Sequence, residues 1–237
     1  MFNATEALDK NRHGNLRFTP AVGFSFARGL NVSPLTGGEV VDAAVYYPVL
    51  FSKTEVPSPL ALLGLYEENV YVDDNNQWTA PYVPGHIRRY PFILATGRAE
   101  GEFIVAIDPQ APHFKGENGE AVFNDQGELN EYSSRSVKFL EVFQRGIEES
   151  KVLLPELEQV LVEHNLPVFD GKAQRSIEGF RVVSQDKVNA LDDATLARWA
   201  RNGLLQLIHA HWSSLRHLQG VARASTARKE RAEAANA

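Results

Sequence analysis

FILATGRAEGEFIVAID, residues 92–108, is the stretch that decides the fold class. It contains two runs rich in aromatic and β-branched residues, 92–97 and 102–108, on either side of the turn-forming residues 98–101. This pattern predicts a pair of antiparallel strands joined by a short turn.

The residues before this pair extend the same pattern. LALLGLY at 60–66 predicts a buried strand, and NVYVD at 69–73 alternates apolar with polar residues, as a half-buried strand does. Residues 74–77 (DNNQ) favour a turn, and Trp78 is expected to begin the return strand. Further upstream, residues 39–45 predict a short helix that leads into a strand over 46–51.

The period changes after residue 132. Apolar residues recur at helical spacing over 137–143 and again over 153–161, and FRVV at 180–183 predicts a last strand. Two helices follow, the first beginning after Asp192 and ending at Gly203. The predicted fold class is therefore α+β, with a largely antiparallel sheet in the N-terminal half and centre and helices concentrated in the C-terminal half. We expect a single domain over residues 1–221 and a flexible, charged, solvated tail over 222–237, where apolar periodicity is absent.

The composition narrows the classes of function. The chain has 237 residues, 43% of them hydrophobic, and a formal net charge of −6, which argues against nucleic-acid binding. It contains no cysteine, which excludes disulfides and thiolate chemistry. The N-terminal residues lack a secretory pattern, and the longest apolar runs are too short to span a bilayer. We therefore expect a cytoplasmic protein without a membrane span.

Familiar catalytic and cofactor motifs are absent from the sequence, including G-x-G-x-x-G, the P-loop and G-x-S-x-G. His209 and His211 are two residues apart and so diverge on a helix, which favours one buried and one exposed ring over a metal site. Residues 73–76 lack the spacing of a calcium loop and favour a turn. We expect no metal and no cofactor.

The segment QWTAPYVPGHIRRYPF, residues 77–92, concentrates three prolines, four aromatic residues and two adjacent arginines. Prolines reduce the entropy lost when a segment becomes ordered, so a rigid ridge is expected here. One guanidinium can stack on Tyr82, Tyr90 or Phe92, while the other presents its planar set of donors to an anion. The alternative is that Arg88 and Arg89 both pair with internal acids and only fix the loop.

We take six residues of this segment as the candidate site for an anionic ligand or a protein partner. They are Trp78, Tyr82, His86, Arg88, Arg89 and Tyr90.

The chain resembles the SapC family of bacterial proteins, named after a member linked to a surface layer. The resemblance follows in order from NRHGNLRF (11–18), YYPVLF (46–51), ALLGLYEENVYVDDNNQW (61–78) and YVPGHIRRYPF (82–92) to IVAID (104–108), VFNDQGEL (122–129), GFRVVSQDKVNAL (179–191) and NGLLQLIHAHWSSLRHL (202–218). Two positions depart from the family pattern, because Ser184-Gln185 precede Asp186 where relatives often carry Asp-Glu, and Pro109 follows Asp108 where relatives often carry an acid.

The resemblance implies no catalytic residue. The family is distinct from the peptide-transport permease of the same name. A permease needs membrane-spanning segments, which this sequence is not expected to form. Relatives commonly occur beside outer-membrane receptors and flavin-dependent halogenase-like enzymes, so the resemblance implies an accessory role next to such a system.

Three hypotheses follow for the function. The first is a non-catalytic binding or accessory protein that uses the segment at 77–92. The second is an enzyme that uses Asp73 or Asp108 with His86, and the third is a component related to the surface layer.

Overall fold

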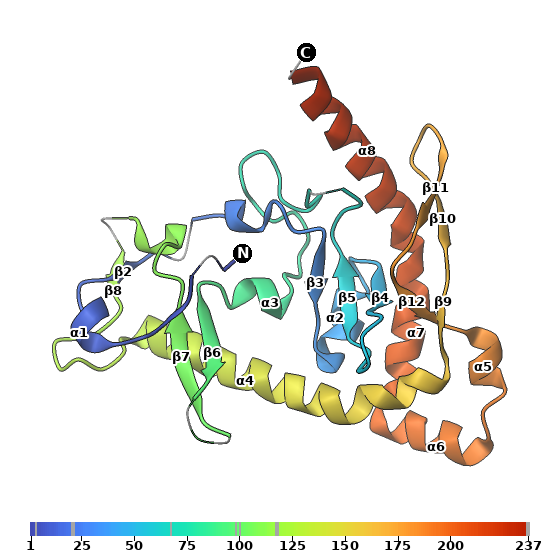
Figure 1. The fold of residues 1–237 in the computed structure, drawn as a ribbon, viewed down its shortest axis with the longest axis horizontal. Helices are drawn as coiled ribbons and strands as arrows, with labels where there is room; N and C mark the ends of the chain where they lie inside the picture. The colour runs from blue at the N-terminus through green and yellow to red at the C-terminus, as the bar shows by residue number, and fades with distance from the viewer. Residues whose placement is uncertain are drawn as a thin grey trace.

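The computed structural model describes residues 1–2, 4–19, 22–66, 68–97, 99, 101–116 and 119–235 (Figure 1). Its main sheet has five strands in the order β3-β5-β4-β12-β9, and every neighbouring pair is antiparallel. The strands are β3 (Val32–Pro34), β4 (Val49–Phe51), β5 (Pro59–Leu62), β9 (Leu161–Glu163) and β12 (Arg181–Val183). The strand predicted at 180–183 is therefore confirmed and lies between strands from the two halves of the chain.

The predicted hairpin forms a second sheet, in which β6 (Phe92–Thr96) pairs with β7 (Phe103–Ile107) in antiparallel register. The short strand β1 (Glu6–Ala7) adds to the other edge of β7. Two further antiparallel pairs are β2 (Arg17–Phe18) with β8 (Glu120–Ala121) and β10 (Leu166–Phe169) with β11 (Gln174–Ile177). The α+β class is thus confirmed, with antiparallel strands throughout these pairs.

The helices include one of 23 residues, α4, and others concentrated towards the C-terminus. The α-helices are α1 (Lys10–His13), α2 (Val40–Ala43), α3 (Gly85–Arg88), α4 (Glu131–Leu153), α5 (Gln185–Asn189), α6 (Asp193–Asn202), α7 (Leu204–Ser214) and α8 (Leu218–Ala235). The 3-10 helices are η1 (Ser25–Ala27), η2 (Gly37–Glu39), η3 (Pro112–Phe114), η4 (Leu154–Gln159) and η5 (Leu215–His217). As predicted, Asp192 caps α6 by accepting from Thr195 N, and Gly203 ends it with φ +85°.

Helix α4 connects the two sheets. It contacts β6 of the second sheet and η2 beside the main sheet, and Figure 1 shows it extending along both. On the side of the second sheet, Phe18, Phe92, Ile107, Val122 and Leu140 form a buried apolar cluster. Helix α3, which lies in the candidate segment, and the N-terminal half of α4 border a cavity that two residues of this cluster, Phe18 and Phe92, also line.

Two predictions of secondary structure are wrong. Residues 69–73 form a loop whose one bridge joins Val72 to Trp78, rather than a strand with a return strand. Residues 154–161 form η4 and then β9 instead of a second helix, because Pro155 lacks the N–H that would continue α4. The hairpin of β10 and β11 after it was not predicted.

The expected solvated tail is, over residues 222–235, a continuation of α8 with one buried face. Ala222 and Ser225 are buried, and Ser225 Oγ accepts a hydrogen bond from Leu65 N at 3.0 Å. Figure 1 shows α8 running beside the β10–β11 hairpin. Small side chains carry this packing, so the helix face has no apolar periodicity to reveal it. The division of the chain at residue 221 stays a prediction.

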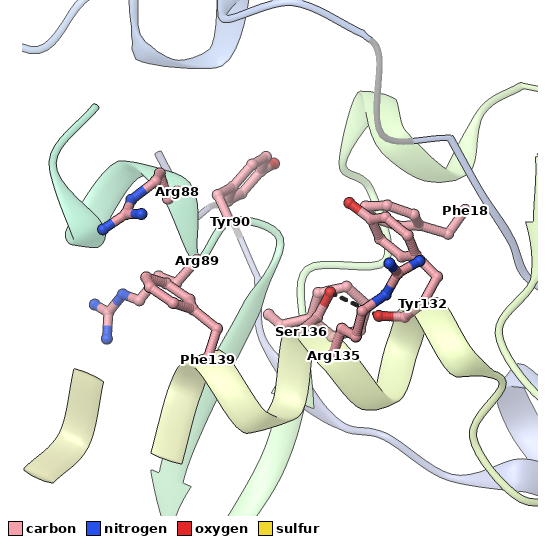
Figure 2. Close-up of a pocket in the computed structure, with 9 residues that line it drawn as sticks. Phe18, Arg88, Arg89, Tyr90, Tyr132, Arg135, Ser136 and Phe139 are labelled. Atoms are coloured by element: carbon pink, nitrogen blue, oxygen red, sulfur yellow. Dashed lines mark hydrogen bonds between the residues drawn. The ribbon is translucent and has the colours of Figure 1, made fainter. Parts of the chain in front are cut away.

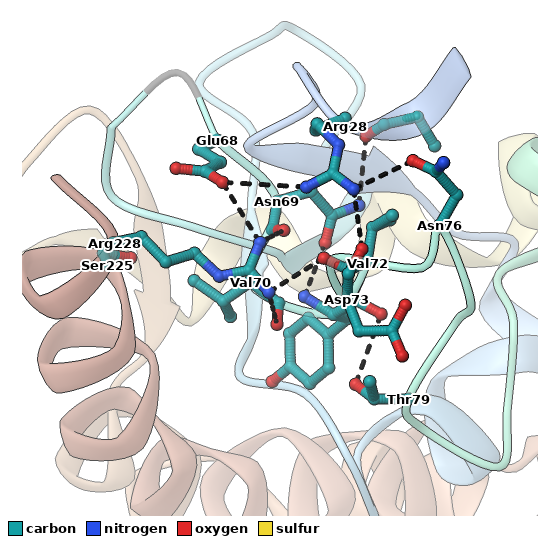
Figure 3. Close-up of polar contacts among 12 residues, drawn as sticks. Arg28, Glu68, Asn69, Val70, Val72, Asp73, Asn76, Thr79, Ser225 and Arg228 are labelled. Carbon is teal, nitrogen blue, oxygen red and sulfur yellow. Dashed lines mark hydrogen bonds and ion pairs between the residues drawn. The ribbon is translucent and has the colours of Figure 1, made fainter. Parts of the chain in front are cut away.

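Arg228, on the same face of α8, holds the loop that was predicted as a strand. Its guanidinium donates to the carbonyl oxygens of Asn69, Val70 and Val72 at 2.7, 3.0 and 2.8 Å (Figure 3). It also lies 3.2 Å from the Glu68 carboxylate. These carbonyls therefore bond a side chain instead of a neighbouring strand, which explains the missing strand.

Arg28 holds the other end of the same loop. It donates to the Asp73 carbonyl at 2.6 Å and to Asn76 Oδ1 at 2.9 Å, and it lies 4.0 Å from the Glu68 carboxylate (Figure 3). We call Arg28 and Arg228 with residues 68–76 the loop clamp.

Within the ranges that the structure describes, the helices lack the combination of length and apolar character that crossing a membrane requires.

Candidate functional site

The candidate segment is held in place by one carboxylate. Glu39 Oε1 accepts hydrogen bonds from the Tyr82 hydroxyl and from Gly85 N, both at 2.7 Å, while its Oε2 accepts from Thr36 N. Gly85 begins α3 in a space without room for a side chain, because a Cβ there would lie 2.8 Å from the Phe143 ring. Glycine at this position therefore lets α3 approach α4 closely.

Two arginines at the end of α3 lie over two aromatic rings of α4. The guanidinium carbon of Arg88 is 4.8 Å from the centre of the Phe139 ring, and that of Arg89 is 5.2 Å from the Phe143 ring. The two rings are four residues apart on one face of α4, with their centres 6.1 Å apart. Tyr82 adds a second ring for Arg88, at 5.6 Å. Cation–π contact thus holds both side chains.

The expected stacking of an arginine on Tyr90 or Phe92 gives way to stacking on α4. Tyr90 instead packs against the ring of Phe26 at 4.4 Å and donates its hydroxyl to the Asp108 carboxylate at 3.2 Å. Phe92 is buried in the apolar cluster. The sequence did not indicate that a helix 50 residues further along would supply the rings.

Neither arginine takes part in an ion pair with a carboxylate of the described residues. Arg88 is exposed, whereas Arg89 is half-buried and its Nε is a buried donor that lacks a hydrogen-bond partner in the described structure. The geometry here thus differs from the alternative in which internal acids neutralise both side chains.

Arg89 does make one polar contact, with its neighbour on α3. Its Nη2 lies 3.0 Å from His86 Nδ1, and because a guanidinium only donates, the imidazole nitrogen accepts. Burial and the nearby positive charge of Arg89 lower the pKa of His86 to about 4. Burial also lowers the pKa of Arg89. At neutral pH the imidazole is therefore uncharged and carries its proton on Nε2.

A cavity of about 410 Å³ opens between α3, β6 and α4, and we call it the α3–α4 pocket. Figure 2 shows Tyr132, Arg135, Ser136 and Phe139 on α4, with the guanidiniums of Arg88 and Arg89 at the Phe139 end of this set and that of Arg135 at the Tyr132 end. Arg135 is exposed, with its guanidinium carbon 5.6 Å from the centre of the Tyr132 ring. The pocket is lined by Phe18, Arg88, Arg89, Tyr90, Phe92, Tyr132, Arg135, Ser136 and Phe139.

Arg135 is a third cation in this pocket and, like the other two, has no carboxylate partner in the described ranges of the chain. Three positive charges beside flat aromatic faces create a local positive potential on a chain of net charge −6. Sequence reasoning missed Arg135 and Phe139. The spacing of Tyr132, Arg135 and Phe139 at three and four residues was the available signal, because it places them on one face of a helix.

Four of the six candidate residues lie in or against the α3–α4 pocket, and two lie outside it. Arg88, Arg89 and Tyr90 line the α3–α4 pocket, and Tyr82 supports Arg88 from outside it. His86 lies on the other side of α3 and lines a different cavity. Trp78 is half-buried and packs against the main core cluster, where its indole N–H donates to the Tyr47 hydroxyl and the Tyr82 carbonyl.

The side chains of the enzyme hypothesis do not share a site in the described structure. Asp73 accepts from Asn75 N and Gln77 N and so stabilises its own turn, as expected for residues 73–76. Asp108 is buried and accepts from the Tyr90 hydroxyl and from Gln110 N. The contact of His86 is to Arg89.

The two histidines of α7 behave as predicted. His209 is exposed, and His211 is fully buried between two strands, with Nδ1 donating to the Val49 carbonyl at 2.7 Å and Nε2 accepting from Val183 N at 3.1 Å. Both ring nitrogens of His211 are thus bonded to backbone atoms of the main sheet.

Comparison with known proteins gives one result. The SapC family model matches residues 8–221, which is most of the chain and includes the whole α3–α4 pocket. Searches of the curated proteins and of the solved structures found no match. The resemblance seen in the sequence is therefore confirmed by the extent of this match, and the chain belongs to the SapC family.

Proposed function

We propose that this SapC-family protein is a non-catalytic, cytoplasmic binding or accessory protein that recognises an anionic group in the α3–α4 pocket. The group belongs to a small molecule or to a protein partner, and the alternative is an accessory role beside a halogenase-like enzyme or an outer-membrane uptake system. The observation that carries the proposal is the set of three arginines, Arg88, Arg89 and Arg135, that line one pocket without a carboxylate partner among the described residues.

The geometry supports an anion for a physical reason. A guanidinium offers five N–H donors in a plane, and a carboxylate or phosphate satisfies two of them at once. Phe139 and Tyr82 already hold Arg88, so the side chain loses less rotamer freedom when an anion binds. Aromatic walls and a volume of about 410 Å³ favour an anion attached to a flat body.

The test is to titrate the protein separately with benzoate, benzyl alcohol and benzylammonium and to monitor binding by NMR of labelled arginine side chains. We expect saturable binding of benzoate alone, with shifts of the Arg88 and Arg135 signals. Removal of one charge-assisted hydrogen bond costs about 1.5–3 kcal/mol, so Arg88→Gln or Arg135→Gln should weaken benzoate by roughly tenfold or more.

The matched control is Arg231→Gln, which removes an exposed arginine from α8 and should leave benzoate affinity unchanged. Equal binding of benzoate and benzyl alcohol, or equal effects of the Arg231 and Arg135 variants, would contradict the proposed pocket.

A further inference from the structure

A second cavity, of about 400 Å³, lies on the other side of Arg89 from the α3–α4 pocket. It is enclosed by the end of β3, the loop between β4 and β5, α3 and the C-terminal half of α4. Its walls are mainly apolar and include Leu35, Pro57, Pro59, Phe143, Ile147 and Leu154. We call it the apolar cavity.

Three polar side chains in the walls that β3 and α4 contribute, Thr36, Ser150 and Lys151, are already bonded within the protein. Ser150 Oγ accepts from Gly37 N at 2.7 Å and donates to the Gly146 carbonyl, and the Thr36 hydroxyl donates to Glu39. Lys151 pairs with Glu148 at 2.9 Å. These three side chains therefore keep their polar atoms in internal contacts, and the rest of the lining is mainly apolar.

The wall formed by α3 differs, because Arg89 and His86 both line the cavity there. Arg89 uses one N–H on His86 Nδ1, which fixes the imidazole proton on Nε2. Nε2–H and the remaining guanidinium N–H groups are all donors. The residues that line the cavity include neither aspartate nor glutamate.

We propose that the apolar cavity binds an aliphatic carboxylate of the medium-chain fatty acid class, whose carboxylate is held by Arg89 and His86 Nε2 and whose chain lies against Pro57, Pro59 and Ile147. This inference rests on the proposed function, because both require that Arg89 has no internal carboxylate partner. It adds a second site and a ligand class.

Three physical features select this class. A donor-only wall rejects a cation, and an uncharged imidazole beside one guanidinium matches a single negative charge. Apolar walls favour methylene groups over a polar body. A volume of about 400 Å³ lies in the range of pockets that enclose small ligands.

The experiment is calorimetric titration of the wild-type protein with hexanoate, heptanoate and octanoate, below their micellar concentrations. Each buried methylene contributes about 0.8 kcal/mol, so we expect the Kd to fall about fourfold for each added carbon. Octan-1-ol and octylammonium should bind at least tenfold more weakly than octanoate. A Kd that does not change with chain length overturns the inference.

Variants locate the ligand. Ile147→Trp fills the cavity and should abolish the dependence on chain length, whereas Arg89→Gln should bring octanoate down to the affinity of octan-1-ol. Arg135→Gln is the matched control, because Arg135 lines the α3–α4 pocket and not the apolar cavity. It should weaken benzoate and leave octanoate unchanged.

A further measurement uses the wild-type protein alone, so it does not depend on whether a variant folds. The Ile147 methyl resonance of the wild-type protein should shift with octanoate and not with benzoate. Octanoate that leaves Ile147 unshifted, or that is lost in Arg135→Gln, overturns this inference while benzoate binding sustains the proposed function. Loss of benzoate binding with octanoate still shifting Ile147 overturns the proposed function alone.

Discussion

Two pairs of arginines in this molecule use the same side chain in opposite ways. Arg28 and Arg228 in the loop clamp donate to backbone carbonyls and lie near Glu68 (Figure 3). Arg88 and Arg89 lie over aromatic rings, and the described structure gives them no carboxylate (Figure 2).

The difference shows that the partners of an arginine's N–H donors indicate whether the side chain stabilises the fold or remains available to bind a ligand. A guanidinium whose donors are bonded inside the protein stabilises the fold, and its removal leaves carbonyls without partners. A guanidinium held only by aromatic faces keeps donors for something else. Position near prolines or within an alanine-rich helix does not distinguish the two cases.

The largest expected effect on stability appears when arginine is replaced by methionine in the loop clamp and, for comparison, in the α3–α4 pocket. Arg228→Met should lower the free energy of unfolding by about 3 kcal/mol, because three backbone carbonyls lose charge-assisted hydrogen bonds. Arg88→Met should change it by less than about 0.5 kcal/mol, as for an exposed residue without such bonds. Urea denaturation measures both.

Arg89→Met sharpens this contrast, since methionine fills similar space and removes a buried Nε without a partner, which offsets part of the lost hydrogen bond to His86 and the lost contact with Phe143. We expect a change of less than about 1 kcal/mol. Arg231→Met controls for removal of an arginine from α8. Equal losses at Arg228 and Arg88 would show that both pairs are structural.

The hairpin at 92–108, the caps of α6 and the burial of one of the two α7 histidines could be predicted because their causes are local. Strand pairing across a short turn, an aspartate that caps its own helix and a two-residue spacing are all visible within a few positions. The expected contact of one guanidinium with Tyr82, Tyr90 or Phe92 belongs to the same group, and Arg88 makes it with Tyr82.

The loop clamp could not be predicted, because its causes are distant in sequence, and the helical spacing of Tyr132, Arg135 and Phe139 did not show which segment their shared face meets. Arg228 lies more than 150 residues from the carbonyls that it bonds, and those bonds replace the strand expected at 69–73. The burial of α8 depends on Ala222 and Ser225, whose small side chains leave no hydrophobic pattern. Arg135 reaches the site only because α4 packs beside α3.

A second test concerns two buried histidines, of which His211 bonds the backbone through both ring nitrogens and His113 has a ring nitrogen without a partner in the described structure. Burial lowers the pKa of His113 and of His211 to about 4, from about 6.5 in an unfolded chain. Between these values the unfolded chain binds the protons, so stability falls as the pH is lowered. From pH 7 to pH 5 each histidine should account for a loss of about 2 kcal/mol.

The matched variants are His113→Phe and His211→Phe, measured by urea denaturation at both pH values. His113 stacks on Phe18 and its buried Nδ1 has no partner in the described structure, so phenylalanine should cost little at pH 7 and remove its share of the acid loss. His211→Phe should be destabilising already at pH 7, because Val49 and Val183 lose their bonds. A pH dependence that His113→Phe leaves intact would contradict a neutral buried ring.

The smallest effect tests whether the aromatic rings of α4 hold the arginines in solution. A double-mutant cycle of Arg88→Met and Phe139→Leu, read by urea denaturation, should give a coupling of about 0.5 kcal/mol, as for an exposed cation–π pair. The cycle of Arg89→Met and Phe143→Leu should give more, about 1 kcal/mol, because Phe143 is buried and Arg89 is half-buried.

Fixing the arginine side chains over the rings matters for recognition more than for stability. A guanidinium that is already fixed over a ring gives an incoming anion an oriented set of donors, and binding then loses less side-chain entropy. If the Arg88 cycle shows no coupling while the Arg89 cycle does, only Arg89 is preorganised. The anion would then be held mainly at Arg89, between the α3–α4 pocket and the apolar cavity, and Arg88 would contribute long-range attraction that added salt weakens.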